Sequence, residues 1–224
     1  MKFYNDFSDK RMKDACVYCH GDCDTVDHIP SKVFLDKPYP DNLFVVPACR
    51  DCNISFSKDE EYVAVFIEWL KSMQNGTDEF GRSQIEKALN HSPKLEDRLF
   101  SSIVLDENDY PLFQPEHERI KNVIRKHAIG LMYYEMGERC IEDIKNISYS
   151  PIYLMEKQMV LDFNVPPVSL LFPEIGSRLM QREIEGAGGW HSIQEENFRY
   201  CIGVGAAIVI RMVFQEFLFC EVFI

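Results

Sequence analysis

The sequence is short of positive charge. It holds 24 lysine and arginine residues against 36 aspartate and glutamate residues, and its formal net charge is −12 at pH 7. A protein that wraps nucleic acid with its whole surface relies on Lys and Arg to neutralise phosphates, so this deficit argues against such a protein. Residues 1–56 carry seven basic and nine acidic side chains, a net charge of −2, and the remaining residues carry −10. Any contact with nucleic acid must therefore be local, metal-assisted or helped by a partner.

The sequence also lacks an apolar leader, because its first residues, MKFYNDFSDKRMKD, contain no hydrophobic region of the kind found in signal peptides. The most apolar stretch, residues 202–224, carries Arg211, Gln215, Glu216 and Glu221. Charges are costly inside hydrocarbon, so we expect this stretch to form buried strands rather than a membrane span. The expectation is a cytoplasmic protein without a membrane partner.

Internal repeats and low-complexity tracts are absent, and 46% of the 224 residues are hydrophobic, which is enough for a core. Such a chain forms one large domain or a small module attached to a larger body. Residues 16–56 are rich in Cys, Asp and Pro and have too little apolar material for an independent core. We therefore divide the chain into a small module over residues 1–60 and a body over residues 61–224.

The body is expected to be α+β, with helices over about 57–145 and a β-rich part over 150–224. Ser57 and Glu60 have the spacing of a capping box, which predicts a helix that starts at Ser57. Two short helices are predicted over residues 83–92 and 92–105. Residues 115–139 predict a long amphipathic helix, with one face formed by Ile120, Val123, Ile124, His127, Leu131 and Tyr134.

The C-terminal part predicts an antiparallel sheet. Residues 198–204, 206–214 and 216–224 are three runs rich in β-branched and aromatic side chains. Residues 151–163 fit a helix and a strand equally well. The expected architecture is thus a small Cys-rich module followed by helices and a terminal antiparallel sheet.

Eight cysteines are present, and five of them lie between Cys16 and Cys52, whereas Cys140, Cys201 and Cys220 are scattered. A disulfide framework is typical of small secreted chains, and this chain fits neither description. We therefore expect reduced thiols, some of which bind a metal.

Two Cys-x-x-Cys pairs, Cys16/Cys19 and Cys49/Cys52, flank the 29 residues from 20 to 48. A tight turn brings both thiolates of a pair to the same side, and two pairs complete a tetrahedral zinc site. Metal binding contributes about 10 kcal/mol or more to folding, which explains how a segment with little core can fold. Four free thiols are the alternative. A thioredoxin-like redox motif is not expected, because it needs a single pair in a βαβ setting, which this sequence lacks. Cys23 is expected to be a bystander.

Between and after these pairs lie VDHIP at residues 26–30, DN at 41–42 and CRDCN at 49–53. This order of motifs resembles the HNH endonucleases of the ββα-metal fold. VPACRDCNISFSKDEEY at 46–62 is similar to a subgroup of stand-alone HNH proteins, and HAIGLMYYEMGER at 127–139 resembles the helix further along in that subgroup. Proteins of this kind resemble components of bacterial anti-phage defence or of restriction systems.

The resemblance implies a role for each matching residue. His28 matches the general base that deprotonates water, and Asp27 matches the acidic ligand of a catalytic divalent ion. Asn42 matches the middle Asn that fastens the loop beneath the catalytic His. Asn53 occupies the third position, which completes the divalent site, so the resemblance implies an HNN variant. The alternatives without catalysis are a surface turn for Asp27 and His28, a turn residue for Asn42 and a helix cap for Asn53.

Phosphodiester cleavage itself requires such groups. A hard divalent ion, Mg²⁺ or Mn²⁺, prefers carboxylate and amide oxygens, whereas thiolates select zinc. A histidine with a pKa near neutrality can take the proton from water. Lys32, Arg50 and Lys58 are candidate phosphate contacts, and solvated surface charges are their alternative reading.

Three hypotheses of function follow. The first is a metal-dependent endonuclease that acts on nucleic acid, DNA above all. The second is a zinc-stabilised module that binds nucleic acid or protein without catalysis. The third is a nuclease kept silent until a regulatory partner, or a further copy of the chain, arrives. Among the other histidines, His20 is expected to be exposed, His127 to lie in the core or an interface, and His191 to belong to a turn, with a substrate role as its alternative.

Overall fold

The computed structural model describes residues 15–41, 43–77, 80–82, 85, 89, 93–105, 111–140, 144 and 146–224. Asn42 and most of the helix predicted over 83–92 lie outside these residues. The chain divides into two units: unit 1 holds residues 1–55 and 124–224, and unit 2 holds residues 56–123. Two long helices, α2 (Arg50–Asn75) and α5 (His117–Met136), contribute residues to both units.

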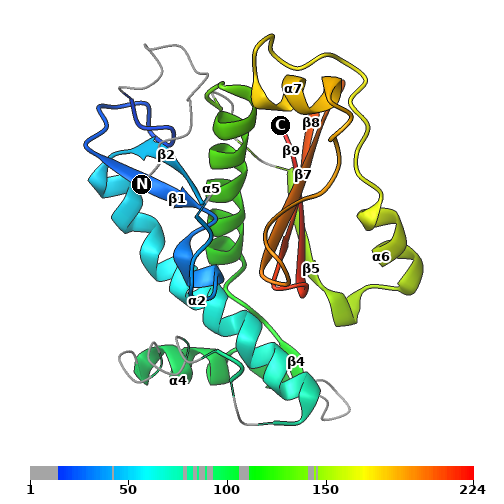
Figure 1. The fold of residues 1–224 in the computed structure, drawn as a ribbon. Coiled ribbons are helices and arrows are strands. Elements are labelled where there is room, and N and C mark those ends of the chain that lie inside the picture. Colours follow the sequence, from blue (N-terminus) through cyan, green and yellow to red (C-terminus); the bar gives the residue numbers. More distant parts are fainter. Residues whose placement is uncertain are drawn as a thin grey trace. The chain divides into compact units, whose positions relative to one another are not determined.

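Unit 1 opens with an antiparallel hairpin, β1 (Thr25–Ile29) and β2 (Phe44–Ala48), whose register sets His28 opposite Val45. The connection between the strands contains a short 3-10 helix, η1 (Lys32–Phe34). Helix α2 follows β2 after a single residue, so the order along the chain is strand, strand, helix (Figure 1).

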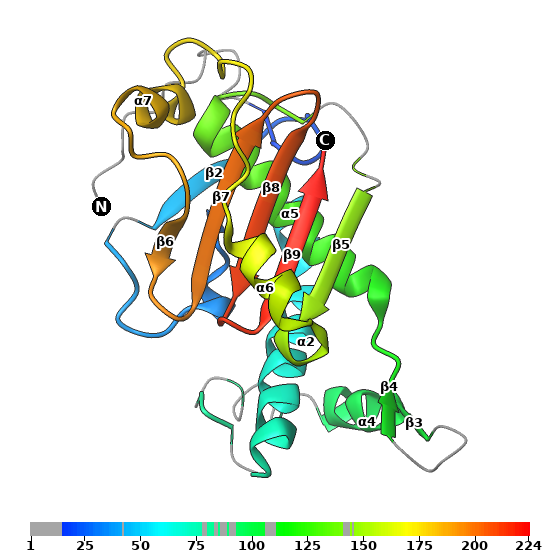
Figure 2. The same ribbon diagram turned by 90° about the vertical axis from the view of Figure 1, so that its right-hand side faces the viewer.

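The C-terminal part of unit 1 is a five-stranded antiparallel sheet with the strand order β5-β9-β8-β7-β6. Its strands are β5 (Asn146–Pro151), β6 (His191–Gln194), β7 (Phe198–Val204), β8 (Ile208–Phe214) and β9 (Leu218–Phe223). The remaining elements of unit 1 are η2 (Ile152–Leu154), α6 (Lys157–Asn164) and α7 (Arg178–Ile184). Figure 2 shows α6 on one face of the sheet and α5 on the other.

Helix α5 connects the hairpin to the sheet through His127. This side chain is fully buried, and its ring lies 5.5 Å from the ring of Phe34 and 5.1 Å from that of Phe214. Its Nε2 accepts a hydrogen bond from the backbone N–H of Ser31 at 3.2 Å. The prediction that His127 belongs to the core is confirmed.

Unit 2 contains the part of α2 from Phe56 onward, α4 (Pro93–Ser101), the first turns of α5 and a short antiparallel pair, β3 (Ile103–Leu105) with β4 (Pro111–Phe113). Within this unit polar contacts join the two long helices. Asp59 of α2 accepts from Arg119 Nη1 at 2.6 Å and from Asn122 Nδ2 at 2.7 Å, both on α5.

The predicted α+β class and the predicted C-terminal antiparallel sheet are confirmed, since residues 198–204, 208–214 and 218–223 are its three central runs. The long helix predicted over 115–139 is α5. Among the described residues, no helix combines the length and the apolar character that crossing a membrane requires.

Two boundary predictions are wrong. The helix expected to start at Ser57 starts at Arg50, because its first N–H is satisfied from elsewhere: Asp24 Oδ1 accepts from the backbone N–H of Arg50 at 2.8 Å. The helix expected to run through residue 105 ends at Ser101, and the β-branched run that begins at Ile103 pairs as a strand instead.

Gly130 marks a close approach between α5 and β1. A Cβ at this position would lie 2.5 Å from Ile29 Cγ1 and 2.6 Å from Ile29 Cδ1, and Ile29 is fully buried. We expect Gly130→Ala to lower the free energy of unfolding by about 1–3 kcal/mol through overpacking. That loss outweighs the gain of about 1 kcal/mol in helix propensity. Urea denaturation of the two proteins measures the difference.

The control for this prediction is the same change in an Ile29→Ala background, where both clashing atoms are gone. There Gly130→Ala should be neutral or stabilising. A wild-type background in which Gly130→Ala stabilises the protein would contradict the close approach.

Candidate metal centre

The four cysteines of the two Cys-x-x-Cys pairs come together in unit 1. Their Sγ atoms all lie within 4.8 Å of one another, and those of Cys19 and Cys49 are 3.7 Å apart. Four sulfurs bound to a tetrahedral zinc ion at about 2.3 Å lie about 3.8 Å from one another. A disulfide needs about 2.05 Å. The group therefore fits a tetrahedral metal ion such as zinc and does not contain a disulfide.

Local backbone geometry aims the first pair of thiols. The N–H of Cys16 donates to Gly21 O at 2.7 Å, and the N–H of His20 donates to Cys16 O at 2.9 Å. His20 takes a φ of 63°, a left-handed conformation that closes the turn after Cys19. A further bond, from the N–H of Val17 to Pro47 O at 3.0 Å, attaches this turn to β2.

The second pair lies at the beginning of α2. The N–H of Cys52 donates to Cys49 Sγ at 3.4 Å, so a thiol takes the place of the usual capping oxygen. Burial, followed by hydrogen bonds from the neighbouring thiols, raises the pKa of Cys52 above its ordinary value. Thiols held this close cannot all ionise by themselves, and a bound cation removes that penalty as their protons leave.

Asp27 and His28 occupy successive positions of β1 and therefore project to opposite faces of the hairpin. Asp27 shares the buried face with Ile29, whereas His28 lies on the more open face with the exposed Val26. The structure thus separates two side chains that the resemblance assigns to one reaction centre.

The Asp27 carboxylate is already fully engaged. Its Oδ2 accepts from Tyr18 Oη at 2.9 Å and pairs with Lys126 Nζ at 2.8 Å, and its Oδ1 accepts from the backbone N–H of His28 at 2.8 Å. The side chains of Asp27 and Lys126 are only 7% and 1% exposed. Lys126 also donates to Ser31 Oγ at 2.8 Å. The carboxylate is therefore the counter-ion of a buried ammonium group, and as it lies it does not fit a divalent ion.

His28 is half-buried, and no hydrogen-bond partner faces its imidazole in the described part of the chain. Burial lowers its pKa below the ordinary value of 6.5, and the positive charge of Lys32 lowers it further. The imidazole is therefore neutral at pH 7, which is the form a general base requires. Lys32 is exposed, and its Nζ lies 5.5 Å from the centre of the Tyr39 ring.

Asn53 lies on the first turn of α2, where its Nδ2 donates to Val26 O at 3.1 Å. This bond ties the helix to β1, one residue before Asp27. Arg50 is exposed at the start of the same helix, and Lys58 is exposed on α2 in unit 2. Asn42, the predicted middle Asn, lies outside the described residues.

Cys16, Cys19, Cys49 and Cys52 are thus brought together as the spacing predicts, and Cys23 is not part of their group. Within the described residues they form the one group of three or more His, Cys, Asp or Glu side chains close enough for a metal. Sequence reasoning missed two residues that decide the role of Asp27, namely Tyr18 and Lys126. The sequence does carry a signal for Lys126, since a charged residue beside His127 falls on the buried side of an amphipathic helix.

The first prediction for this centre concerns the metal. The wild-type chain should hold about one zinc ion, and Cys49→Ser should hold close to none, because three thiolates rarely complete a structural site. The loss of metal should lower the midpoint of thermal unfolding. Elemental analysis of the purified proteins and thermal melts with and without a chelator provide the measurements. Cys23→Ser is the matched control, and equal loss of zinc in that variant would contradict the assignment.

The second prediction concerns the buried ion pair. Lys126→Met leaves the Asp27 carboxylate buried without its counter-ion, which should lower the free energy of unfolding by about 3–5 kcal/mol. Adding Asp27→Asn should recover most of that loss, because the amide carries no charge. Chemical denaturation of the single and double variants gives the coupling.

Lys121→Met is the control for the ion pair. Lys121 is 38% exposed and pairs with the exposed Glu118, so this change should cost less than about 1 kcal/mol. If Lys126→Met also lowered the free energy of unfolding by less than about 1 kcal/mol, the buried ion pair would not stabilise the fold.

Comparisons with protein-family models, with curated proteins and with solved structures return no match for this chain.

Proposed function

We propose that the chain is a metal-dependent endonuclease of the HNH type, which hydrolyses phosphodiester bonds in nucleic acid, DNA above all. The observation that carries the proposal is a β-hairpin followed directly by a helix, with a four-cysteine group that joins the hairpin to the start of the helix. His28 lies on the open face of the hairpin, and Asn53 on the first turn of α2 is bonded to the same strand. In such an arrangement zinc supports the site and takes no part in the reaction.

The proposed mechanism assigns steps to the residues of this chain. His28, neutral at pH 7, takes a proton from the attacking water. Lys32 is exposed near His28, Arg50 is exposed at the start of α2, and both are proposed to contact the phosphate. Lys58, exposed on the part of α2 in unit 2, is proposed as a separate phosphate contact of that unit. A Mg²⁺ or Mn²⁺ ion would supply charge neutralisation on the phosphate. Asn53 can offer its amide oxygen to that ion, whereas Asp27 would first have to leave Lys126.

A zinc-stabilised module without catalysis is the second candidate. One observation favours it: the carboxylate that should bind the catalytic ion is instead held by Tyr18 and Lys126 in a buried site. In this reading Asp27 stabilises the hairpin, and the open face with His28 serves only for binding nucleic acid or protein.

The charge of the body supports a regulated enzyme. Residues 57–224 carry a net charge of −10, which repels nucleic acid and attracts a basic partner. A nuclease kept silent by this charge until a regulatory protein or a further copy of the chain arrives would suit an effector of anti-phage defence or restriction. Vigorous, unassisted degradation of DNA by the purified chain would exclude this silenced form.

The test is a nuclease assay on plasmid DNA, single-stranded DNA and RNA in the presence of Mg²⁺ or Mn²⁺. Replacing His28 with Ala should slow cleavage by about 10²–10⁴-fold, since a positioned general base contributes that much. Zinc content should stay at the wild-type level. Cleavage should vanish when the added divalent ion is omitted.

His20→Asn is the matched control for this assay. His20 is an exposed histidine of the same module, and Asn tolerates its left-handed backbone, so cleavage should continue unchanged. Activity in His28→Ala equal to that of the wild type, in a folded protein that still holds zinc, would refute the nuclease assignment. Zinc as the one metal bound, without cleavage of any substrate, would favour the binding module.

A further inference from the structure

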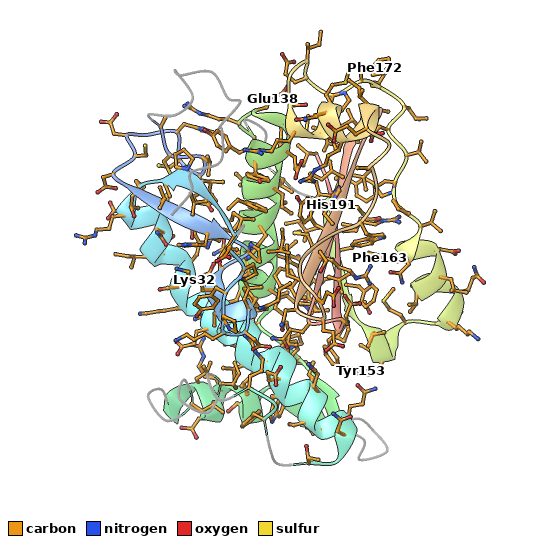
Figure 3. All side chains as sticks on the ribbon, viewed as in Figure 1. Lys32, Glu138, Tyr153, Phe163, Phe172 and His191 are labelled. Carbon is orange, nitrogen blue, oxygen red and sulfur yellow. The ribbon has the colours of Figure 1, made fainter. Side chains whose placement is uncertain are left out.

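Unit 1 contains a second feature that the proposed function does not use. A cavity of about 420 Å³ opens beside β6 and β7, and its walls include Tyr134, Arg178, Arg182, Trp190, His191 and Tyr200. Its volume lies in the range of small-molecule sites. Figure 3 shows His191 and Lys32 on opposite sides of α5. The cavity also includes Phe44, which shares the buried face of the hairpin with its register partner Ile29, whereas His28 lies on the other face.

Two arginines converge on this cavity from α7. Arg178 and Arg182 are four residues apart, so both project from the same side of the helix. Ser177 caps the helix by accepting from the N–H of Met180 at 3.1 Å, which holds this turn in place. Two guanidinium groups on one wall offer the paired donors that phosphate and carboxylate groups bind.

A buried network behind the wall orients Arg182. Glu135 has no exposed side-chain surface; its Oε1 pairs with Arg182 Nη1 at 2.7 Å and accepts a hydrogen bond from Tyr200 Oη. Arg182 Nη1 also lies 3.3 Å from Tyr200 Oη. These contacts engage one nitrogen of the guanidinium, and its side chain remains 25% exposed.

The network is also incomplete, because Glu135 Oε2 is buried and accepts no hydrogen bond from the part of the chain that the structure describes. A buried acceptor without a donor is costly and calls for an explanation. A carboxylate placed to hold an arginine at the rim of a cavity needs only the one contact.

Arg178 is positioned differently, by an aromatic stack. The ring of Phe44 lies 3.7 Å from that of Tyr134, with the two planes 9° apart. The Arg178 guanidinium lies 4.4 Å from the centre of the Tyr134 ring and, since Phe44 covers one face, it occupies the other. Stacking of this kind uses the face of a guanidinium, whereas anions bind to its in-plane N–H groups.

The cavity is larger than an isolated anion requires, and most of its remaining wall is aromatic, with Ser192 and Ile193 as the exceptions. Trp190 is held by a hydrogen bond from its Nε1 to Asn164 O at 2.8 Å, and His191 lies 5.6 Å from the ring of Tyr200. Burial, and then the charge of Arg182, lowers the pKa of His191 to about 4. The imidazole is therefore a neutral ring at pH 7, able to donate one hydrogen bond and accept another.

We propose that this cavity binds a small molecule that joins an oxyanion group to a planar ring, with Arg178 and Arg182 holding the oxyanion and the aromatic wall holding the ring. Arg178, Arg182 and Glu135 together carry one positive charge in a chain whose net charge is −12, so the cavity concentrates the sign that attracts such a ligand. Mononucleotides and aromatic carboxylates share this chemistry. The inference does not depend on nuclease activity.

The test is calorimetric titration of the full chain with three probes: adenosine 5′-monophosphate, an indole carboxylate and inorganic phosphate. At least one of the two ring-bearing probes should bind, and more tightly than phosphate. Arg178→Gln should weaken that binding at least about tenfold, because charged hydrogen bonds contribute that much. Arg98→Gln is the matched control, since it removes the same charge from an exposed pair in unit 2 and should leave the affinity unchanged.

Arg182 needs a paired change, because Arg182→Gln alone leaves Glu135 buried without its partner. The double variant Arg182→Gln/Glu135→Gln removes both charges and should bind at least about tenfold more weakly while its melting point stays close to that of the wild type. Binding of the nucleotide and not the carboxylate, or the reverse, identifies the source of the oxyanion and supports the site. Failure of both ring-bearing probes, binding that survives Arg178→Gln, or phosphate bound as tightly as either probe would overturn the proposal.

Discussion

The ammonium group of Lys126 holds unit 1 together at the junction of hairpin and helix. It lies between Asp27 Oδ2 and Ser31 Oγ, both at 2.8 Å, in a site almost without solvent. Burying two charges is costly unless each is paired and hydrogen-bonded, and here Tyr18 and the backbone of His28 supply the remaining bonds. The next residue along α5, His127, packs against the sheet through Phe214. One turn of a single helix therefore fixes the hairpin on one side and the sheet on the other, so a defect there would loosen both.

The two faces of the hairpin carry side chains with different roles. Asp27 points inward and stabilises, while the neighbouring His28 points outward and is left without a hydrogen-bond partner among the described residues. The four-cysteine group joins the two chain ends of the same hairpin, because the thiols of residues 16 and 19 precede β1 and those of residues 49 and 52 follow β2. An Asp-His pair in a strand thus need not be one reactive unit. The Asp27 carboxylate could bind a divalent ion only after its ion pair with Lys126 had broken.

Local signals in the sequence were enough for several elements. The spacing of the cysteines predicted their group, the apolar period over 115–139 predicted α5, and the runs after residue 198 predicted three strands. Two of the failures share one physical cause, which is that a distant residue supplied the deciding contact. Asp24 caps α2 at Arg50, so the local capping box at Ser57 was overridden. The partner of Asp27 lies on another element, 99 positions further along the chain. The cavity depends on α7, a helix of seven residues that is too short to show a period.

The stack of Arg178, Tyr134 and Phe44 reaches from the cavity wall to the hairpin. Phe44 is the register partner of Ile29 in β1, and the next residue of β2, Val45, is the partner of His28. A shift of one ring in such a stack moves its neighbours, because the packed interior of a protein has low compressibility. A molecule that draws Arg178 toward itself therefore works against the packing beneath β2. Thermodynamic reciprocity gives the converse: if the ligand proposed for the cavity changes the affinity of the hairpin for the nucleic acid proposed on its open face, that nucleic acid would change the affinity of the cavity by the same factor.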